Sequence, residues 1–190
     1  MLPSPIVRLS LLTALLAAPA AAQAPTLALE ACTSSGYPAD ARCGTLRVPE
    51  NRDRPGGRQL SLHVVVLPAR SAMPAREAVT FFGGGPGQAA TDFVPWMGQL
   101  LAPVRQTRDL LFVDQRGTGR SSPLECNLRD PANPQTYLDH FIPPDRAAVC
   151  RDSLARTADL SRYGFPQLAH DTDAVRAALG YERLDLWGGS

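Results

Sequence analysis

The chain contains no lysine, because all 19 of its basic residues are arginines. This absence excludes mechanisms that need a side-chain amine: a Schiff base, a Ser–Lys dyad or the phosphate-binding lysine of a P-loop. An excess of charge of one sign is also lacking, since 18 acidic residues leave a formal net charge of +1. Such a balance creates no field that attracts nucleic acid or an anionic membrane surface. We therefore expect no nucleic-acid partner.

The apolar stretch near the amino terminus is too short to cross a bilayer. It runs over residues 9–22, which are 14 residues, whereas a membrane-spanning helix needs about 20. Arg8 precedes it and small residues end it at Ala22, a pattern typical of a cleaved secretory leader. We therefore predict a signal peptide over residues 1–22, a secreted or periplasmic mature chain that begins near Gln23, and no stable membrane insertion.

The rest of the chain has the size of one domain. At about 150 residues per domain, 190 residues leave too little for a second one. Its 15 glycines and 18 prolines are 33 of 190 residues, about 17%, which is below the level of about 25–30% typical of low-complexity disorder. No internal repeat is visible. We expect residues 23–190 to form a packed core.

The four cysteines contain no C-x-x-C pair and have no histidine nearby, so no zinc site or other metal site is predicted. Cys32 and Cys43 are 11 residues apart, and Cys126 and Cys150 are 24 apart. Sequence alone allows three connectivities, of which we favour the two local pairs because each closes a loop-rich segment. Disulfides agree with an oxidising destination.

Strand and helix patterns alternate along the mature chain. The first two strands are separated by turn residues and predict an antiparallel hairpin at one edge of a sheet. The later elements alternate between strand and helix, which predicts an α/β fold with a mostly parallel sheet. An irregular, cysteine-containing excursion is expected over residues 121–162. The expected strands are 45–48, 60–64, 79–82, 110–113 and 184–187, and the expected helices are 92–105, 145–157 and 166–179, the last capped by Gly180.

A glycine-rich loop follows the strand that ends at residue 82. Ligands of open α/β sheets gather at the carboxyl ends of strands, so this position is suited to a site. Without side chains, residues 83–87 can bring backbone N–H groups close to an oxyanion, and Pro86 would stiffen the exit of the loop. A tight turn before a helix explains the same residues equally well.

Residues 114–121 follow the next strand and read D-Q-R-G-T-G-R-S. Two glycines permit a compact turn in which Asp114 accepts hydrogen bonds from nearby backbone and arginine groups. Arginine is a poor general base, so a structural role is at least as well supported as a catalytic one. We expect this segment to shape the floor of the site.

The last predicted strand is followed by Gly188, Gly189 and Ser190. These are the first three positions of the nucleophile elbow G-x-S-x-G, in which a sharp strand-to-helix turn exposes the serine hydroxyl. Taken singly, a G-x-S tripeptide has little specificity, because glycine and serine are common in loops.

Together, the three segments resemble the proline iminopeptidase group of α/β-hydrolases. Residues 83–87 resemble its H-G-G-P-G oxyanion motif, residues 114–121 its D-Q-R-G-x-G-R-S motif, and residues 187–190 its elbow. The leader, the local cysteines and residues 171–176 are more similar to the secreted tripeptidyl-aminopeptidase-like branch. The resemblance covers about residues 43–190 and is more specific for the family than for the substrate.

The resemblance implies roles for individual residues. Ser190 would attack an acyl carbon, and a backbone N–H of Gly84 or Gly85 would bind the oxyanion. Gly83 departs from the motif, which often has histidine there, and this is expected to alter packing more than mechanism. The other motif residues would support the loops: Pro86, Gly87, Asp114, Gln115, Arg116, Gly117, Gly119, Arg120, Gly188 and Gly189.

In α/β-hydrolases the catalytic acid and histidine follow the nucleophile in the chain, so both would lie after Ser190. His63, His140 and His170 all precede it, and ordinary surface or capping roles are expected for them. His63 is expected on the polar face of an edge strand. We interpret the sequence as the amino-terminal part of one α/β-hydrolase domain, and predict that this part alone is inactive.

These observations predict a serine hydrolase that cleaves peptide or amide bonds through an acyl-enzyme, most plausibly an aminopeptidase. A small peptide or aminoacyl substrate is expected, with no cofactor and no partner protein. One alternative is a carboxylic-ester hydrolase on the same fold. Another is a dinucleotide-binding oxidoreductase, because residues 85–90 fit G-x-G-x-x-A and Asp114 could bind the ribose. A non-catalytic binding module is a further alternative.

Overall fold

The computed structural model describes residues 26–85, 87–126, 128, 132–138 and 142–189. The predicted signal peptide lies outside the described residues, and so do Pro86, His140 and Ser190.

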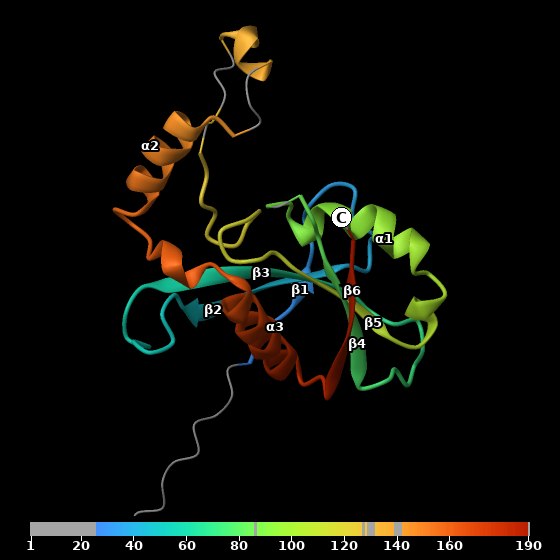
Figure 1. Ribbon diagram of the computed structural model, residues 1–190. Coiled ribbons are helices and arrows are strands. Elements are labelled where there is room, and N and C mark those ends of the chain that lie inside the picture. The colour runs from blue at the N-terminus through green and yellow to red at the C-terminus, as the bar shows by residue number, and fades with distance from the viewer. Residues whose placement is uncertain (1–25, 86, 127, 129–131, 139–141, 190) are drawn as a thin grey trace, which may run out of the picture.

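Among the described residues, six strands form one sheet in the order β1-β2-β3-β5-β4-β6 (Figure 1). Every strand predicted from the sequence is present, and each is longer than predicted. The strands are β1 (Glu30–Ala31), β2 (Arg42–Pro49), β3 (Gln59–Leu67), β4 (Glu77–Phe82), β5 (Asp109–Val113) and β6 (Arg183–Gly188).

The sheet is mixed rather than mostly parallel. The β2–β3 hairpin is antiparallel, as predicted, but β1 also pairs antiparallel with β2, and β3 with β5. Only β4 pairs in parallel, with β5 on one side and β6 on the other. The expectation of a mostly parallel sheet therefore holds only for the half formed by β5, β4 and β6. The reason is that the edge of β3 that does not pair with β2 pairs with β5. Because this pairing is antiparallel, the hairpin and the parallel half form one mixed sheet.

Two helices connect the parallel strands. The segment between β4 and β5 forms a 3₁₀ turn η1 (Ala90–Phe93), helix α1 (Val94–Leu100) and a second turn η2 (Val104–Gln106). The single helix predicted over residues 92–105 is therefore interrupted, because Pro103 lacks an N–H and disfavours helical geometry at the residue before it. Helix α3 (Phe165–Leu179) leads to β6 and ends, as predicted, at Gly180, whose φ is +77°.

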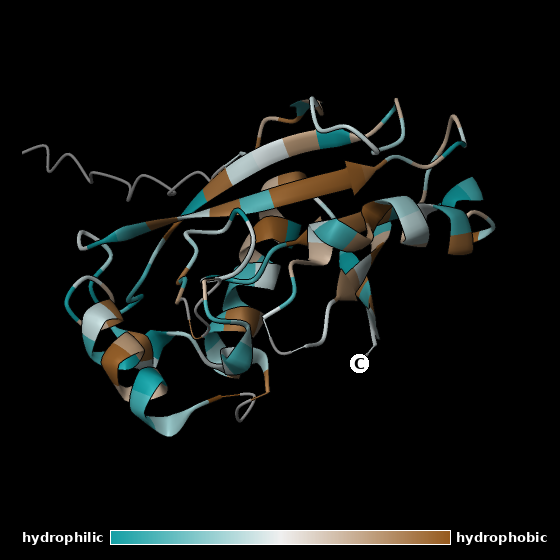
Figure 2. Ribbon diagram, turned by 90° about the horizontal axis from the view of Figure 1, so that it is seen from above, coloured by the Kyte–Doolittle hydropathy of each residue, from teal (hydrophilic) through white to brown (hydrophobic). Residues whose placement is uncertain are grey.

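Side chains alternate along β3 between two apolar layers, one on each face of the sheet. Val64 and Val66 pack with Val175 of α3 on one face. Val65 and Leu67 pack with Met97 of α1 on the other. This period-two alternation is typical of a strand buried on both faces. In Figure 2 one long strand of the sheet is mostly hydrophobic along its length.

His63 does not lie on the polar face of an edge strand, and that prediction was wrong. β3 is an inner strand between β2 and β5, so its alternate side chains face the protein on both sides. His63 is consequently buried, and its backbone N–H donates to the Ser121 hydroxyl at 2.8 Å.

Both predicted disulfides, Cys32–Cys43 and Cys126–Cys150, are present. The second belongs to the predicted excursion, which carries the turn η3 (Pro134–Tyr137), helix α2 (Pro144–Leu154) and the turn η4 (Leu160–Arg162). α2 stands away from the sheet and buries none of its residues (Figure 1). Among the described residues, no helix combines the length and the apolar character needed to cross a bilayer.

Candidate active site

The glycine-rich loop and the strand that leads to the elbow meet at one edge of the sheet. Phe82 at the end of β4 is in register with Gly188 at the end of β6. One residue further, the N–H of Gly189 donates to the carbonyl of Phe82 at 3.4 Å. Ser190 itself lies outside the described residues, so its predicted position is untested. The residues that deliver it nevertheless lie directly beside the start of the glycine-rich loop.

The glycine-rich loop is a tight turn with unused backbone donors. Gly85 and Gly87 have φ of +112° and +94°, which only glycine adopts readily, and Gln88 N–H donates to the Gly84 carbonyl at 3.2 Å. No hydrogen bond to a described residue uses the N–H of Gly84 or Gly85. These two groups are therefore available to bind an anionic oxygen, as the resemblance implies.

Gly83 allows the start of the glycine-rich loop to lie close to the residues that follow the loop. A Cβ atom at this position would lie 3.3 Å from the Gln88 carbonyl oxygen and 3.4 Å from Cε2 of Phe93. The first distance is closer than ordinary van der Waals contact. Gly83 therefore lies in close packing with the exit of the loop, and the expected effect of its departure from histidine stays a prediction.

A cleft of about 460 Å³ opens between the glycine-rich loop and the start of α3. One wall comes from the loop and the other from the segments at η4 and the turn after β5. No carboxylate lines it among the described residues. The lining residues are Gly83, Gly84, Gly85, Gly87, Gln115, Arg116, Tyr163, Gly164, Phe165 and Leu168.

Asp114 ties the exit of the glycine-rich loop to the turn after β5. Its side chain is fully buried and accepts hydrogen bonds from Thr91 N–H at 2.9 Å and the Thr91 hydroxyl at 3.1 Å. It also accepts one from the Arg120 backbone N–H at 3.0 Å, while the Arg120 side chain is exposed. The prediction that Asp114 accepts bonds within a compact turn is confirmed for the backbone donors. A ribose-binding role does not fit, because the carboxylate is fully buried and accepts these hydrogen bonds from the protein.

The turn after β5 is compact for the predicted reason. Gly117 and Gly119 have φ of +85° and +50°. A Cβ atom on Gly119 would overlap Oδ2 of Asp114. At the end of the turn, the Ser121 hydroxyl accepts a hydrogen bond from His63 N–H, and the Ser122 hydroxyl accepts one from Ser61 N–H. These two bonds satisfy backbone donors of β3 beyond the point where its pairing with β5 ends.

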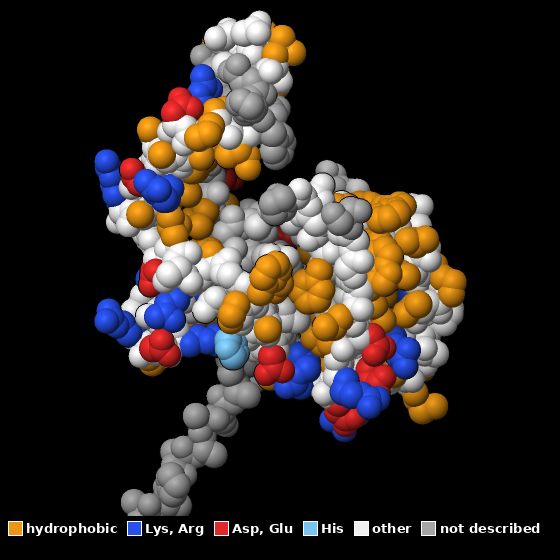
Figure 3. Space-filling model, viewed as in Figure 1, with side chains coloured by type: hydrophobic (Ala, Val, Ile, Leu, Met, Phe, Trp, Pro, Cys, Tyr) orange, Lys and Arg blue, Asp and Glu red, His pale blue; other side chains and the backbone are white. Residues whose placement is uncertain are grey.

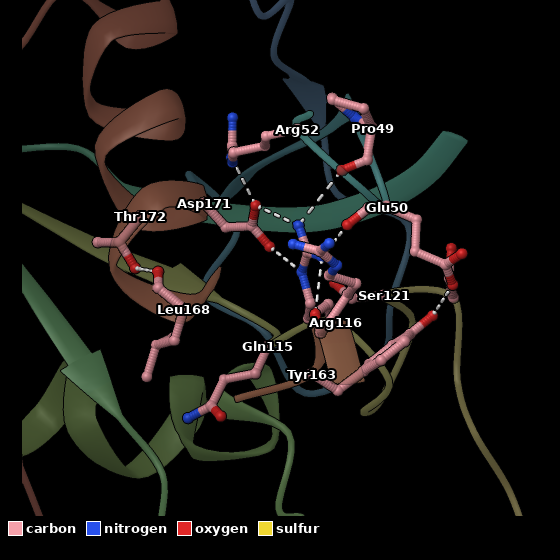
Figure 4. A network of polar contacts seen from close by, with 12 residues as sticks. Pro49, Glu50, Arg52, Gln115, Arg116, Ser121, Tyr163, Leu168, Asp171 and Thr172 are labelled. Carbon is pink, nitrogen blue, oxygen red and sulfur yellow. Dashed lines mark hydrogen bonds and ion pairs between the residues drawn. The ribbon is translucent and has the colours of Figure 1, made fainter. Parts of the chain in front are cut away.

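Arg116 lies at the centre of a buried polar network (Figure 4). Its Nε and Nη2 donate to the two carboxylate oxygens of Asp171 at 2.7 and 2.8 Å. Its Nη1 donates to the carbonyls of Glu50 and Arg162 at 2.8 and 2.9 Å. Sequence reasoning gave Asp171 no role. The sequence did contain a signal for it, because Asp171 places a carboxylate on the same face of α3 as Thr172 and Val175. These three are the buried residues of the helix.

Neither described histidine lies in the wall of the cleft. His63 is on the α1 side of the sheet, and its Nε2 is buried without a hydrogen-bond partner among the described residues. Burial lowers the pKa of His63, although the carboxylate of Asp114 opposes this shift. His170 is exposed on α3. The described part of the chain also contains no cluster of acidic, histidine and cysteine side chains able to hold a metal ion.

Leu186 and Trp187 of β6 are exposed, and so is Phe165 at the start of α3. Apolar side chains gather on the face of the molecule that Figure 3 shows. β6 is the last strand of the described sheet and pairs only with β4.

Comparisons with known proteins agree with this geometry. Residues 77–190 match the family described as alpha/beta hydrolase fold. Carboxylesterase B of Mycobacterium tuberculosis is 34% identical over 154 residues, which are 73% of this chain and 29% of that protein. Serine protease Hip1 of the same organism is 30% identical over 176 residues, 83% of this chain and 33% of that protein.

Tripeptidyl aminopeptidase of Streptomyces coelicolor is 26% identical over 170 residues, 80% of this chain and 30% of that protein. The chain thus spans about a third of the length of the relatives it matches.

Proposed function

This chain belongs to the α/β-hydrolase fold family, and from that premise we propose that it carries the nucleophile and oxyanion loop of a serine hydrolase that cleaves peptide or amide bonds. The hydrogen bond from Gly189 N–H to the Phe82 carbonyl supports this proposal most directly. It brings the residue before Ser190 to the start of the loop in which the N–H groups of Gly84 and Gly85 have no hydrogen-bond partner among the described residues.

In the proposed reaction, the Ser190 hydroxyl attacks the carbonyl carbon of the scissile bond and loses its proton to a base. The carbonyl oxygen becomes an oxyanion, which the N–H of Gly84 or Gly85 stabilises. The intermediate then collapses to an acyl-enzyme on Ser190 as the protonated amine departs, and water hydrolyses the acyl bond. By the order of the fold, the base and its acid partner would follow Ser190 in the chain.

The proposed substrate is the amino-terminal part of a peptide. The names of two relatives, a serine protease and a tripeptidyl aminopeptidase, support peptide cleavage. The second candidate, an ester hydrolase, is supported by the 34% identity to a carboxylesterase. Turnover of a peptidyl p-nitroanilide separates the two. We expect a peptidase to cleave it and Ser190→Ala to abolish that cleavage, whereas an ester hydrolase would cleave only the p-nitrophenyl ester of the same acyl group.

The nucleophile is tested by covalent labelling of the protein, in the full length that its gene encodes, with a fluorophosphonate probe. We expect one adduct, mapped by mass spectrometry to Ser190 and absent from Ser190→Ala. Labelling of Ser121→Ala is the matched control, because Ser121 is a buried serine that bonds β3. An adduct that persists in Ser190→Ala would overturn the assignment.

We also propose an extracellular or periplasmic location. Two disulfides in a chain of this size suit an oxidising compartment. The amino terminus of the protein recovered from its native source tests this: residue 23 is expected, and retention of residues 1–22 would contradict the proposed signal peptide.

A further inference from the structure

Arg116 and Asp171 are both charged and almost fully buried. Their side chains are 2% and 4% exposed. Burying an ion pair is favourable only where the geometry is good and the remaining donors and acceptors are satisfied. Here the guanidinium bonds both carboxylate oxygens in a fork and two backbone carbonyls with its third nitrogen. This arrangement holds several segments in one position.

The segments joined by Arg116 are distant in sequence. The arginine belongs to the turn after β5, its carboxylate partner belongs to α3, and its carbonyl partners are Glu50, just after β2, and Arg162 in η4. Asp171 also accepts a bond from Arg52 at 2.7 Å. One guanidinium therefore fixes the position of η4 and α3 relative to the turn after β5.

The same network holds the wall of the cleft. The Tyr163 ring lies with its centroid 5.9 Å from Cζ of Arg116, and its hydroxyl donates to Glu50 at 2.8 Å. Tyr163, Gly164 and Phe165 form the wall that faces the glycine-rich loop. Asp171 is not in the lining of the cleft, so it acts on this wall through Arg116.

We propose that Asp171 is a positioning residue of the hydrolytic site: by orienting Arg116, it sets the separation between the cleft wall at residues 163–165 and the glycine-rich loop that binds the oxyanion. This proposal rests on the proposed function. It assigns no contact with substrate to Asp171. Its consequence is that loss of the carboxylate impairs the site even in molecules that remain folded.

Two variants test the proposal in the protein at the full length that its gene encodes. Asp171→Asn removes the carboxylate charge but leaves the guanidinium buried and unpaired, so it is expected to lose stability as well. The double variant Arg116→Gln/Asp171→Asn removes both charges and avoids that penalty. Asp173→Asn is the matched control, because it breaks an exposed Arg–Asp pair on the same helix.

The primary measurement is the rate of fluorophosphonate labelling of Ser190, under conditions where urea titrations show each variant to be folded. Misplacing a wall of the site is expected to lower the second-order rate by about tenfold to a hundredfold in the double variant. The loss should lie mainly in the probe's half-saturating concentration, and Asp173→Asn should label like wild type. A folded double variant with the wild-type labelling rate would overturn the proposal.

Hydrogen exchange separates this proposal from the proposed function. If wild-type Ser190 does not label, the assignment of the nucleophile fails, and the positioning role is then decided by exchange alone. Backbone amides at residues 162–168 are expected to exchange at least severalfold faster in the double variant, while β3 and β5 exchange as in wild type. Unchanged exchange at residues 162–168 would overturn the positioning role in either case.

Discussion

The carboxylate of Asp114 accepts both the backbone N–H and the hydroxyl of Thr91, at 2.9 and 3.1 Å, and links the exit of the glycine-rich loop to β5. The two residues are 23 positions apart in sequence. This contact makes the D-Q-R-G segment a support for the glycine-rich loop, because Thr91 belongs to η1, the first turn after that loop.

Replacing Asp114 with asparagine should destabilise the fold. All three groups that bond Asp114 are donors. An asparagine amide would direct its own donors at one of them and leave a buried group unsatisfied, which costs about 1–3 kcal/mol. Urea unfolding measures the loss. Asp92→Asn, at an exposed neighbouring position, is the control, and equal unfolding free energies for the two variants would contradict the role of Asp114.

Gly119→Ala should be costly because the new methyl group has no space. It would overlap Oδ2 of Asp114 and Cβ of Ala89, and the backbone there has a φ of +50°. Overpacking of this kind lowers the unfolding free energy by about 1–3 kcal/mol. Gly56→Ala adds the same methyl group where no atom lies within 4 Å. The prediction fails if both alanine variants unfold at the same denaturant concentration.

Alkaline pH should weaken the fold through Tyr163. Burial, and then its hydrogen bond to Glu50, raise the pKa of Tyr163 from 10.0 to about 12. Because the unfolded chain releases this proton first, stability is full below pH 10 and falls as the pH rises toward about 12. Tyr163→Phe should flatten the dependence of unfolding free energy on pH in this window. An unchanged slope would show that Tyr163 does not contribute.

His63 should make the protein sensitive to mild acid. Burial lowers its pKa from 6.5, with Asp114 opposing and Arg120 adding to the shift. The unfolded chain therefore binds a proton below pH 6.5 before the folded chain does, and stability is lost as the pH falls. His63→Leu should reduce the slope of unfolding free energy below pH 6.5. His170→Gln, which retains His63, should lose as much unfolding free energy below pH 6.5 as the wild type does.

The two disulfides should contribute to different transitions. Cys32 and Cys43 pack against the core on the α1 side. Cys32→Ser/Cys43→Ser should lower the global unfolding free energy by about 3 kcal/mol. Cys126–Cys150 anchors α2, which buries no side chain, so Cys126→Ser/Cys150→Ser should open that region locally. Faster proteolysis within α2 and little change in global unfolding are expected. The prediction would be contradicted if Cys126→Ser/Cys150→Ser lowered the global unfolding free energy as much as Cys32→Ser/Cys43→Ser does.

Local patterns predicted the elements whose residues determine their own geometry. The continuous apolar run at residues 110–113 became β5, and the helix before Gly180 ended where the glycine permits a positive φ. β1 was missed because two residues carry no alternation. The helix at residues 92–105 was predicted as continuous because the helical spacing of its apolar residues was given more weight than the helix-breaking effect of Pro103.

By itself, the amino-acid sequence determined the chain order of the helices and of every strand except β1, together with the three motifs at the carboxyl ends of strands, and it favoured the two local disulfides. These depend on side-chain chemistry, spacing and backbone preference within a few residues. Only the tertiary structure decided that β3 is an inner strand that buries His63, and that Arg116 pairs with Asp171 55 positions away. Such pairings depend on which segments the folded sheet brings together, because burial removes the water that would otherwise satisfy each charge.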